Sequence, residues 1–325
     1  MKLITKIKMN GVIFFTSNEN PASSYNELNN MSIQKLNSDQ RKVYNVAMES
    51  SNTGEQLLLL ICGGPGTGNT FTADLIIKNL ETKNILTHAF SFMWSAVFQL
   101  NVHCPKSTIY NLLCANQKTT TNTFIHSLRD RSWENLKEVI MKIKDKDMIV
   151  IDEVSMTTAS LLVGMDNIFR QAFEKDKPFG GKDMILLGDF CQIPPNNETS
   201  LANILASYQS GSQKMFRGDD SQSVIYLQAA KLFMQFQRFV LKQQMRAAED
   251  LVHCALIERF SLKNKNPPIT QDVINNFHCL TPELIKEDPS FKNAAIAVQS
   301  NEKRIQFGKL KAIQFGIEHQ EPIFY

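Results

Sequence analysis

The chain has 325 residues, which is long enough for two domains with hydrophobic cores of their own. Its hydrophobic fraction of 43% and charged fraction of 21% are those of an ordinary soluble globular protein. The net charge of +3 is too small to predict nucleic-acid binding by itself, and it leaves a local basic groove open.

The six cysteines are scattered and form no C-x-x-C pair, which predicts a reducing compartment and argues against a disulfide framework, a zinc knuckle or a metal cluster. No apolar run approaches the ~20 residues that span a bilayer. The basic N-terminus, "MKLITKIKMNGVIFF", has too short an apolar stretch for a secretory signal and lacks the arginine of a mitochondrial presequence. We expect an intracellular protein without membrane contact, placed in the nucleus or mitochondrion if its source is eukaryotic.

Strands and helices alternate along the first two thirds of the chain. Residues 1–30 carry no sustained period and are interpreted as an extension. A helix over 36–49, capped by Asn37 or Ser38, precedes the buried strand "QLLLLIC" and the amphipathic helix "TFTADLIIKNLE". Two further apolar strands, "DMIVIDE" and "DMILLGD", end in acidic residues. Such strands, bounded by helices, predict an α/β fold with a parallel sheet that is covered on both faces.

Loops are expected at 174–183, 194–200 and 209–223, and the third is interpreted as a domain boundary. The predicted domains are therefore 31–215 and 216–325. The second region reads as helices around 226–260, a Pro-rich loop "KNKNPPIT", a strand "AAIAV" and a helix from about Asn301.

The stretch "GGPGTGNT" lies between the first buried strand and the following helix. Glycines there let the backbone wrap its N–H groups around phosphate, and the helix adds its N-terminal dipole. Thr70 is placed to ligate Mg²⁺ through its hydroxyl. The alternative is a plain glycine turn between a strand and a helix.

Asn69 stands where the phosphate-loop pattern G-x-x-x-x-G-K-[ST] requires lysine. Lysine bridges the β- and γ-phosphates and neutralises charge that develops during transfer. Losing such a contact costs about 1.5–3 kcal/mol in binding and ~10²–10³ in rate. Lys78 lies about 13 Å further along the helix and cannot replace it. We expect the loop to hold nucleotide and turnover to be severely impaired.

Two strand ends supply acidic and amide groups. Asp152 is placed to hold the Mg²⁺ shell, and Glu153 to polarise the attacking water. Gln192, after Asp189, is placed to sense the γ-phosphate. The alternatives are an ordinary acidic strand end and a turn before the Pro-Pro corner.

The motifs "LNSDQRKVY", "GGPGTGNT", "IDEVSM", "PFGGKD" with "GDFCQIPP", and "LKQQMRAAED" occur in the order found in the petite-integration-frequency family of DNA helicases. The resemblance covers about residues 33–310. It implies a superfamily 1 helicase that moves 5′ to 3′ and has two RecA-like domains. ATP and Mg²⁺ are expected in the cleft between these domains, and single-stranded or forked DNA is the expected partner. Roles in DNA repair, recombination and telomere maintenance are also implied.

By this resemblance, Gln40 reads adenine, and the nucleotide site comprises Gly63, Gly64, Pro65, Gly66, Thr67, Gly68, Asn69 and Thr70. Thr70 and Asp152 are the metal ligands, and Glu153, Gln192 and Arg246 are the catalytic residues. Arg246 would reach the γ-phosphate from the second domain; without the resemblance it reads as a surface charge on a helix.

Three departures separate the chain from the family pattern. Asn69 is the first. The second is "AFSFMWSAVFQL", where Phe92 and Trp94 stack on bases or are buried in the core, together with Tyr110 in place of a histidine. The third is length, because the family continues into motifs beyond this chain.

We therefore expect an ATP-dependent DNA helicase lineage with a P-loop RecA-like domain and a partial, truncated second RecA-like domain. Weak binding of Mg²⁺-nucleotide, little hydrolysis and no unwinding are expected of the chain alone. Two alternatives stay open: a non-catalytic module that binds nucleotide or single-stranded DNA, and a degenerate relic with an exposed sheet edge. A monomer is the favoured state.

Overall fold

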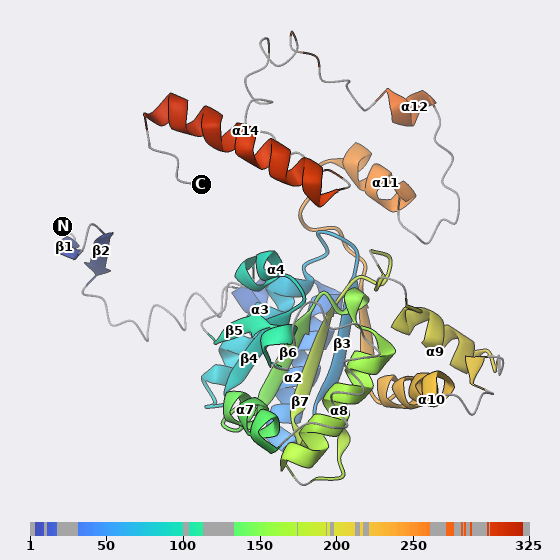
Figure 1. The fold of residues 1–325 in the computed structure, drawn as a ribbon. Coiled ribbons are helices and arrows are strands. Elements are labelled where there is room, and N and C mark those ends of the chain that lie inside the picture. Colours follow the sequence, from blue (N-terminus) through green and yellow to red (C-terminus); the bar gives the residue numbers. More distant parts are fainter. Residues whose placement is uncertain are drawn as a thin grey trace. The chain divides into compact units, whose positions relative to one another are not determined.

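The computed structural model describes residues 4–9, 12–17, 32–99, 104–112, 133–173, 175–192, 194–195, 198–211, 215–216, 221–260, 271–275, 281, 283, 287, 298 and 300–320. The chain divides into two compact units, Met1–Pro267 and Pro268–Tyr325. Figure 1 shows the elements of both units.

The strands are β1 Ile4–Met9, β2 Val12–Ser17, β3 Leu58–Gly63, β4 Thr87–Ser91, β5 Lys106–Thr108, β6 Met148–Asp152, β7 Asp183–Gly188 and β8 Gln237–Leu241. The helices of the first unit are α2 Ser38–Thr53, α3 Asn69–Glu81, α4 Trp94–Gln99, α5 Ile109–Leu112, α7 Trp133–Ile143, η1 Val154–Met156, α8 Ala159–Phe173, η2 Pro178–Gly181, α9 Leu201–Gln209, α10 Ser221–Phe233 and α11 Leu251–Phe260. The second unit contains α12 Gln271–Ile274 and α14 Asn301–His319.

Six strands of the first unit form one sheet in the order β5-β4-β6-β7-β3-β8, and every pairing in it is parallel. The predicted α/β class with a parallel sheet is confirmed. Strand β6 is buried along its whole length, as continuous apolar strands of parallel sheets are. Because the strands are parallel, the residues that follow β3, β6 and β7 meet at one edge of the sheet.

Helices cover the two faces of this sheet (Figure 1). One face is packed by α2 and α3, whose Val43, Ala47 and Ile76 join the strand residues Leu59 and Ile61 in one buried cluster. The other face is packed by α7, α8, α9 and α10. The predicted helix at 36–49 is α2, and Asn37 caps it through a capping box with Gln40.

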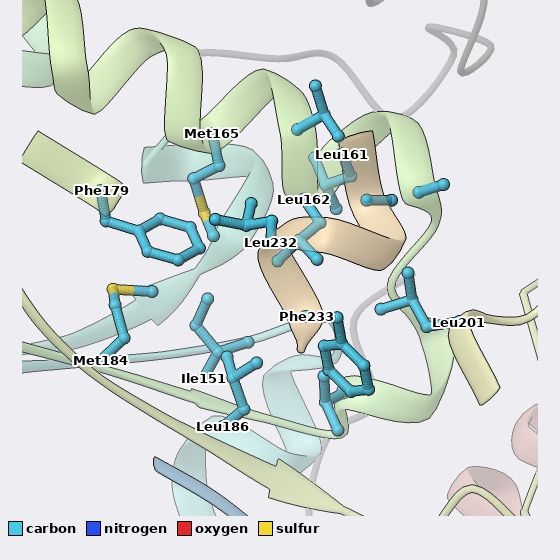
Figure 2. Packing of buried hydrophobic residues seen from close by; sticks show 14 of the residues in the cluster. Ile151, Leu161, Leu162, Met165, Phe179, Met184, Leu186, Leu201, Leu232 and Phe233 are labelled. Carbon is cyan, nitrogen blue, oxygen red and sulfur yellow. The ribbon is translucent and has the colours of Figure 1, made fainter. Parts of the chain in front are cut away.

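Phe179 belongs to the core of the second face and is fully buried (Figure 2). Its ring contacts Phe169 and Phe236 edge to face, at centroid distances of 6.4 and 5.8 Å. Its backbone has a φ of 48°, and its N–H donates to a carboxylate oxygen of Asp166 at 2.6 Å. This bond satisfies a donor that the core would otherwise leave unpaired.

The expected domain boundary near residue 216 lies inside the first unit. Helix α10 packs against α8, and β8 pairs with β3, so both belong to the first sheet and its core. The sequence analysis assigned α10 and β8 to the second domain because the loop before them is polar. Domain membership is decided by burial against distant elements, which a polar loop does not reveal. The partial second RecA-like domain stays a prediction, and most of its expected strand "AAIAV" lies outside the described residues.

The extension at 1–30 contains an antiparallel hairpin of β1 and β2, which the sequence did not predict. The helix expected from Asn301 is present as α14. Within the described ranges, no helix is long and apolar enough to cross a membrane, and no three potential metal ligands cluster.

Candidate nucleotide site

The loop between β3 and α3 turns through two glycines with positive φ angles. Gly66 and Gly68 have φ angles of 83° and 91°, values that glycine adopts without strain. The Thr67 hydroxyl and backbone N–H both donate to the Gly64 carbonyl, at 2.8 and 3.2 Å. Helix α3 begins at Asn69, so its first backbone N–H groups lie next to this loop. The site can therefore offer several backbone donors to an anion.

The Asn69 side chain is bound back onto the loop. Its amide nitrogen donates to the Gly63 carbonyl at 3.0 Å. Its amide oxygen is buried and has no hydrogen-bond partner among the described residues. The packing is close, because a Cβ on Gly63 would lie 2.6 Å from that oxygen and 2.3 Å from the Thr67 hydroxyl. Asn69 thus places a neutral donor on the protein's own backbone where the motif has a cation.

Gln40 supports the loop from helix α2. It is 1% exposed, and its amide nitrogen donates to the Thr67 carbonyl at 3.1 Å. Its amide oxygen accepts from the Asn37 N–H at 3.2 Å. A Cβ on Gly68 would come within 2.5 Å of the Gln40 amide nitrogen, so the two segments are in close contact. Sequence reasoning assigned Gln40 to adenine and missed this role in holding the loop.

The predicted carboxylates lie at the same edge of the sheet. Asp152 ends β6 and is 8% exposed, and burial raises its pKa to about 6. One of its carboxylate oxygens accepts the Glu153 N–H at 2.8 Å. Glu153 is half-buried and has a φ of 60°, a conformation that costs a non-glycine residue energy and is typical of functional sites. Burial, and then the charge of Asp189, raise the pKa of Glu153.

Gln192 lies in a tight turn after β7. Its backbone N–H donates to the Asp189 carbonyl at 2.9 Å, and the Cys191 N–H donates to the Asp189 carboxylate at 2.9 Å. The Gln192 side chain is half-buried. The turn interpretation of this segment is therefore correct, and it does not conflict with a phosphate-sensing role for the side chain.

Arg246 lies beside the phosphate loop. It is exposed, and its backbone N–H donates to the Gly66 carbonyl at 3.1 Å. It follows β8 and precedes α11, so it belongs to a loop of the first unit and not to a helix surface. The neighbouring residues Gln244 and Met245 also bind the loop, a contact that no local sequence pattern indicates.

The segment after β4 contains the aromatic residues that the sequence assigned either to base stacking or to the core. Phe92 is partly buried, packs against the main core and contacts Tyr110 edge to face at 6.2 Å. This favours the core interpretation of Phe92 over stacking on bases. The Trp94 side chain lies outside the described part of the structure.

The site residues fit a magnesium-bound nucleotide. The Thr70 hydroxyl and the Asp152 carboxylate are oxygen donors, which Mg²⁺ prefers. The raised pKa of Asp152 also indicates a buried carboxylate whose ionised form a cation would stabilise. The glycine loop and the start of α3 supply the donors for phosphate.

Comparison with known proteins places this site in a family. The family model of the PIF1-like helicases matches residues 35–253, which include the loop, both carboxylates and Arg246. The chain belongs to the PIF1-like helicase family.

Individual PIF1 relatives match parts of the chain. The ATP-dependent DNA helicase Pif1 of Psychrobacter is 27% identical over 152 residues, which are 46% of this chain and 21% of the relative. The helicase PIF4 of Trypanosoma brucei is 26% identical over 190 residues, which are 57% of this chain and 21% of the relative. The matched segment thus spans about a fifth of the length of these relatives.

Solved PIF1 structures share the fold. The Bacteroides Pif1 helicase, in complex with ADP-AlF3 and single-stranded DNA, superposes with a TM-score of 0.53 at 18% identity. The superposition covers 89% of this chain and 58% of the Bacteroides chain. This likeness supports the α/β architecture described above.

Proposed function

We propose that the chain is part of a PIF1-type, ATP-dependent DNA helicase in which nucleotide binding is retained and hydrolysis is slow. The observation that carries the proposal is the Asn69 side chain, which donates to the Gly63 carbonyl inside a loop of otherwise intact geometry. The loop keeps its backbone donors, whereas the charge that would neutralise the β- and γ-phosphates is absent.

The remaining residues have defined tasks. Backbone N–H groups of the loop and of the start of α3 bind the phosphates. Thr70 and Asp152 would hold Mg²⁺, which when bound neutralises phosphate charge. Glu153, at the same sheet edge, would accept a proton from the attacking water, and its raised pKa favours that transfer. Gln192 and Arg246 would hydrogen-bond the γ-phosphate from two further segments.

The proposed macromolecular partner is single-stranded or forked DNA. Support comes from the Bacteroides Pif1 helicase, which was solved with single-stranded DNA. Duplex unwinding, 5′-to-3′ movement and roles in repair, recombination or telomere maintenance belong to this proposal. So does an intracellular setting, the nucleus or mitochondrion in a eukaryote.

A non-catalytic module that binds nucleotide and DNA is the second candidate, and the same Asn69 contact favours it. The two candidates differ in turnover. The test is a titration of Mg-ADP and Mg-ATP at pH 7.5, where Asp152 is ionised, followed by ATPase assays with and without a single-stranded oligonucleotide. Binding with slow, DNA-stimulated turnover supports the helicase proposal. Binding of both ligands with no turnover supports the module, and absence of nucleotide binding contradicts both.

A further inference from the structure

Residues 242–250, here called the connector, join β8 to α11 and run along the outside of the phosphate loop. Three hydrogen bonds fasten the two segments. The Met245 and Arg246 N–H groups both donate to the Gly66 carbonyl, at 2.9 and 3.1 Å. The Gln244 amide nitrogen donates to the Pro65 carbonyl at 2.7 Å. Asn37, the cap of α2, also contacts the Met245 sulfur at 3.6 Å.

Gln244 uses both ends of its amide. While its nitrogen holds Pro65, its oxygen accepts the Arg246 N–H at 3.2 Å. The fit is close, because a Cβ on Gly66 would lie 2.0 Å from the Gln244 amide oxygen and 3.0 Å from the Arg246 Cβ. The Gln244 side chain therefore bridges the phosphate loop and the backbone of Arg246, in addition to the direct bonds from Met245 and Arg246 to the Gly66 carbonyl.

The Pro65 carbonyl belongs to the same peptide unit as the Gly66 N–H. Peptide units are planar, and the described chain has no cis peptide bond, so this N–H points opposite to the carbonyl that Gln244 holds. Gly66 has a φ of 83°, and glycine lets a neighbouring peptide plane turn over at little cost. A hydrogen bond on the carbonyl side is a direct way to keep the N–H in one orientation.

We propose that Gln244 is a positioning residue for nucleotide binding: it orients the Pro65–Gly66 peptide and couples the phosphate loop to the connector. The coupling continues into α11, because the Ala247 carbonyl accepts from the Asp250 N–H and the Cys254 thiol, each at 3.0 Å. The inference rests on the proposed nucleotide site. It adds a residue that the phosphate-loop motif does not contain.

The test compares Gln244→Met, which has a similar volume and no amide, with Gln244→Glu, which keeps an acceptor for Arg246 and loses the donor to Pro65. Gln243→Met is the matched control, since Gln243 is the exposed neighbouring residue. The probe is Mg-ADP, titrated calorimetrically. Both Gln244 variants lose the bond to the Pro65 carbonyl, and this loss should weaken affinity about 5-fold. Gln244→Met also loses the acceptor for the Arg246 N–H, so its affinity should fall at least as far. Affinities within about twofold of the Gln243→Met control overturn the assignment.

Amide hydrogen exchange supplies the second readout, and it separates this inference from the proposed function. In the ligand-free chain, the Met245 and Arg246 amides should exchange faster in Gln244→Met than in Gln243→Met. Mg-ADP should slow these amides in the unmodified chain and have less effect in Gln244→Met. If the unmodified chain binds no nucleotide, the proposed function fails. The exchange rates of the ligand-free chain then still decide whether Gln244 fastens the connector. Equal rates in Gln244→Met and Gln243→Met overturn the proposal that it does.

Discussion

Substitution of Asn69 by lysine is the most direct test of how this site works. The present side chain donates one neutral hydrogen bond to the Gly63 carbonyl at 3.0 Å. Lysine removes that bond, which contributes about 1 kcal/mol to holding the loop. It also removes a buried amide oxygen that has no partner among the described residues. The substitution therefore exchanges a weak internal contact for an ammonium group available to phosphate.

The expected gain in Mg-ATP affinity is the difference between the hydrogen bond that lysine makes to phosphate and the internal bond that Asn69 loses. A hydrogen bond to a charged group contributes about 1.5–3 kcal/mol, so the net gain in binding is about 0.5–2 kcal/mol after the lost internal bond is subtracted. This corresponds to about 2- to 30-fold tighter binding of Mg-ATP. The gain in turnover is larger, ~10²-fold or more, because the ammonium opposes charge that develops during transfer. The kcat effect should thus exceed the effect on affinity.

The assay is steady-state ATPase activity with saturating single-stranded DNA, on the unmodified chain and on Asn69→Lys in parallel. Asn69→Gln is the control, because it lengthens the amide without adding charge, and it should leave turnover near that of the unmodified chain. Substantial turnover in the unmodified chain would refute the reasoning about the loop. If the unmodified chain and Asn69→Lys both bind DNA and neither hydrolyses ATP, the residue at position 69 is not what prevents turnover.

Three further predictions concern the fold and the site. Gly63→Ala should lower the free energy of unfolding in urea by about 1–3 kcal/mol, because its Cβ would lie 2.3 Å from the Thr67 hydroxyl. The control Gly64→Ala, whose Cβ would meet nothing within 4 Å, should change that free energy by less than about 0.5 kcal/mol. Phe179→Ala should cost about 3–5 kcal/mol in the same measurement, since the ring is fully buried, while Met141→Ala, at a residue 65% exposed, should cost far less. The folded-state pKa of Asp152 is raised from 3.8 to about 6, so its stabilising contribution is present below about pH 4 and is lost as the pH rises to about 6. The free energy of unfolding of Asp152→Asn, measured against the unmodified chain, should therefore rise by up to about 3 kcal/mol between pH 4 and pH 7, and a difference that is constant with pH would contradict the assignment.

The parts of the fold that the sequence predicted correctly are those with a local pattern. The strands "LLLLIC" and "MIVID" are continuous apolar runs, and their burial follows from that composition alone. The capping box of Asn37 and Gln40 is likewise a relation between residues three positions apart. The pairing of β3 with β8 has no such signal, because it joins segments far apart in the chain. The sequence therefore assigned β8 to the second predicted domain.

The site shows the same division. Gly66 and Thr70 were assigned to the site because a spacing motif specifies them, and Asp152 because it ends an apolar strand. The bond from Gln244 to the Pro65 carbonyl joins residues 179 positions apart, and nothing local to either residue predicts it. Whether Phe92 stacks on a base or packs in the core was also left open by the sequence, since either environment suits an aromatic ring.

The contacts around the phosphate loop also explain how its geometry can persist without lysine. Its carbonyl groups are held from outside: the Thr67 carbonyl by Gln40, and the Gly66 and Pro65 carbonyls by the connector. None of these bonds involves the side chain of residue 69. Because most of the bonds that hold the backbone shape come from residues other than 69, a change at position 69 can slow turnover and leave the binding loop largely intact. On this reasoning, Asn69→Lys should raise turnover without altering the exchange rates of the Met245 and Arg246 amides in the ligand-free chain. A change in those rates would indicate that residue 69 also shapes the loop, and the separation of shape from charge would then be wrong.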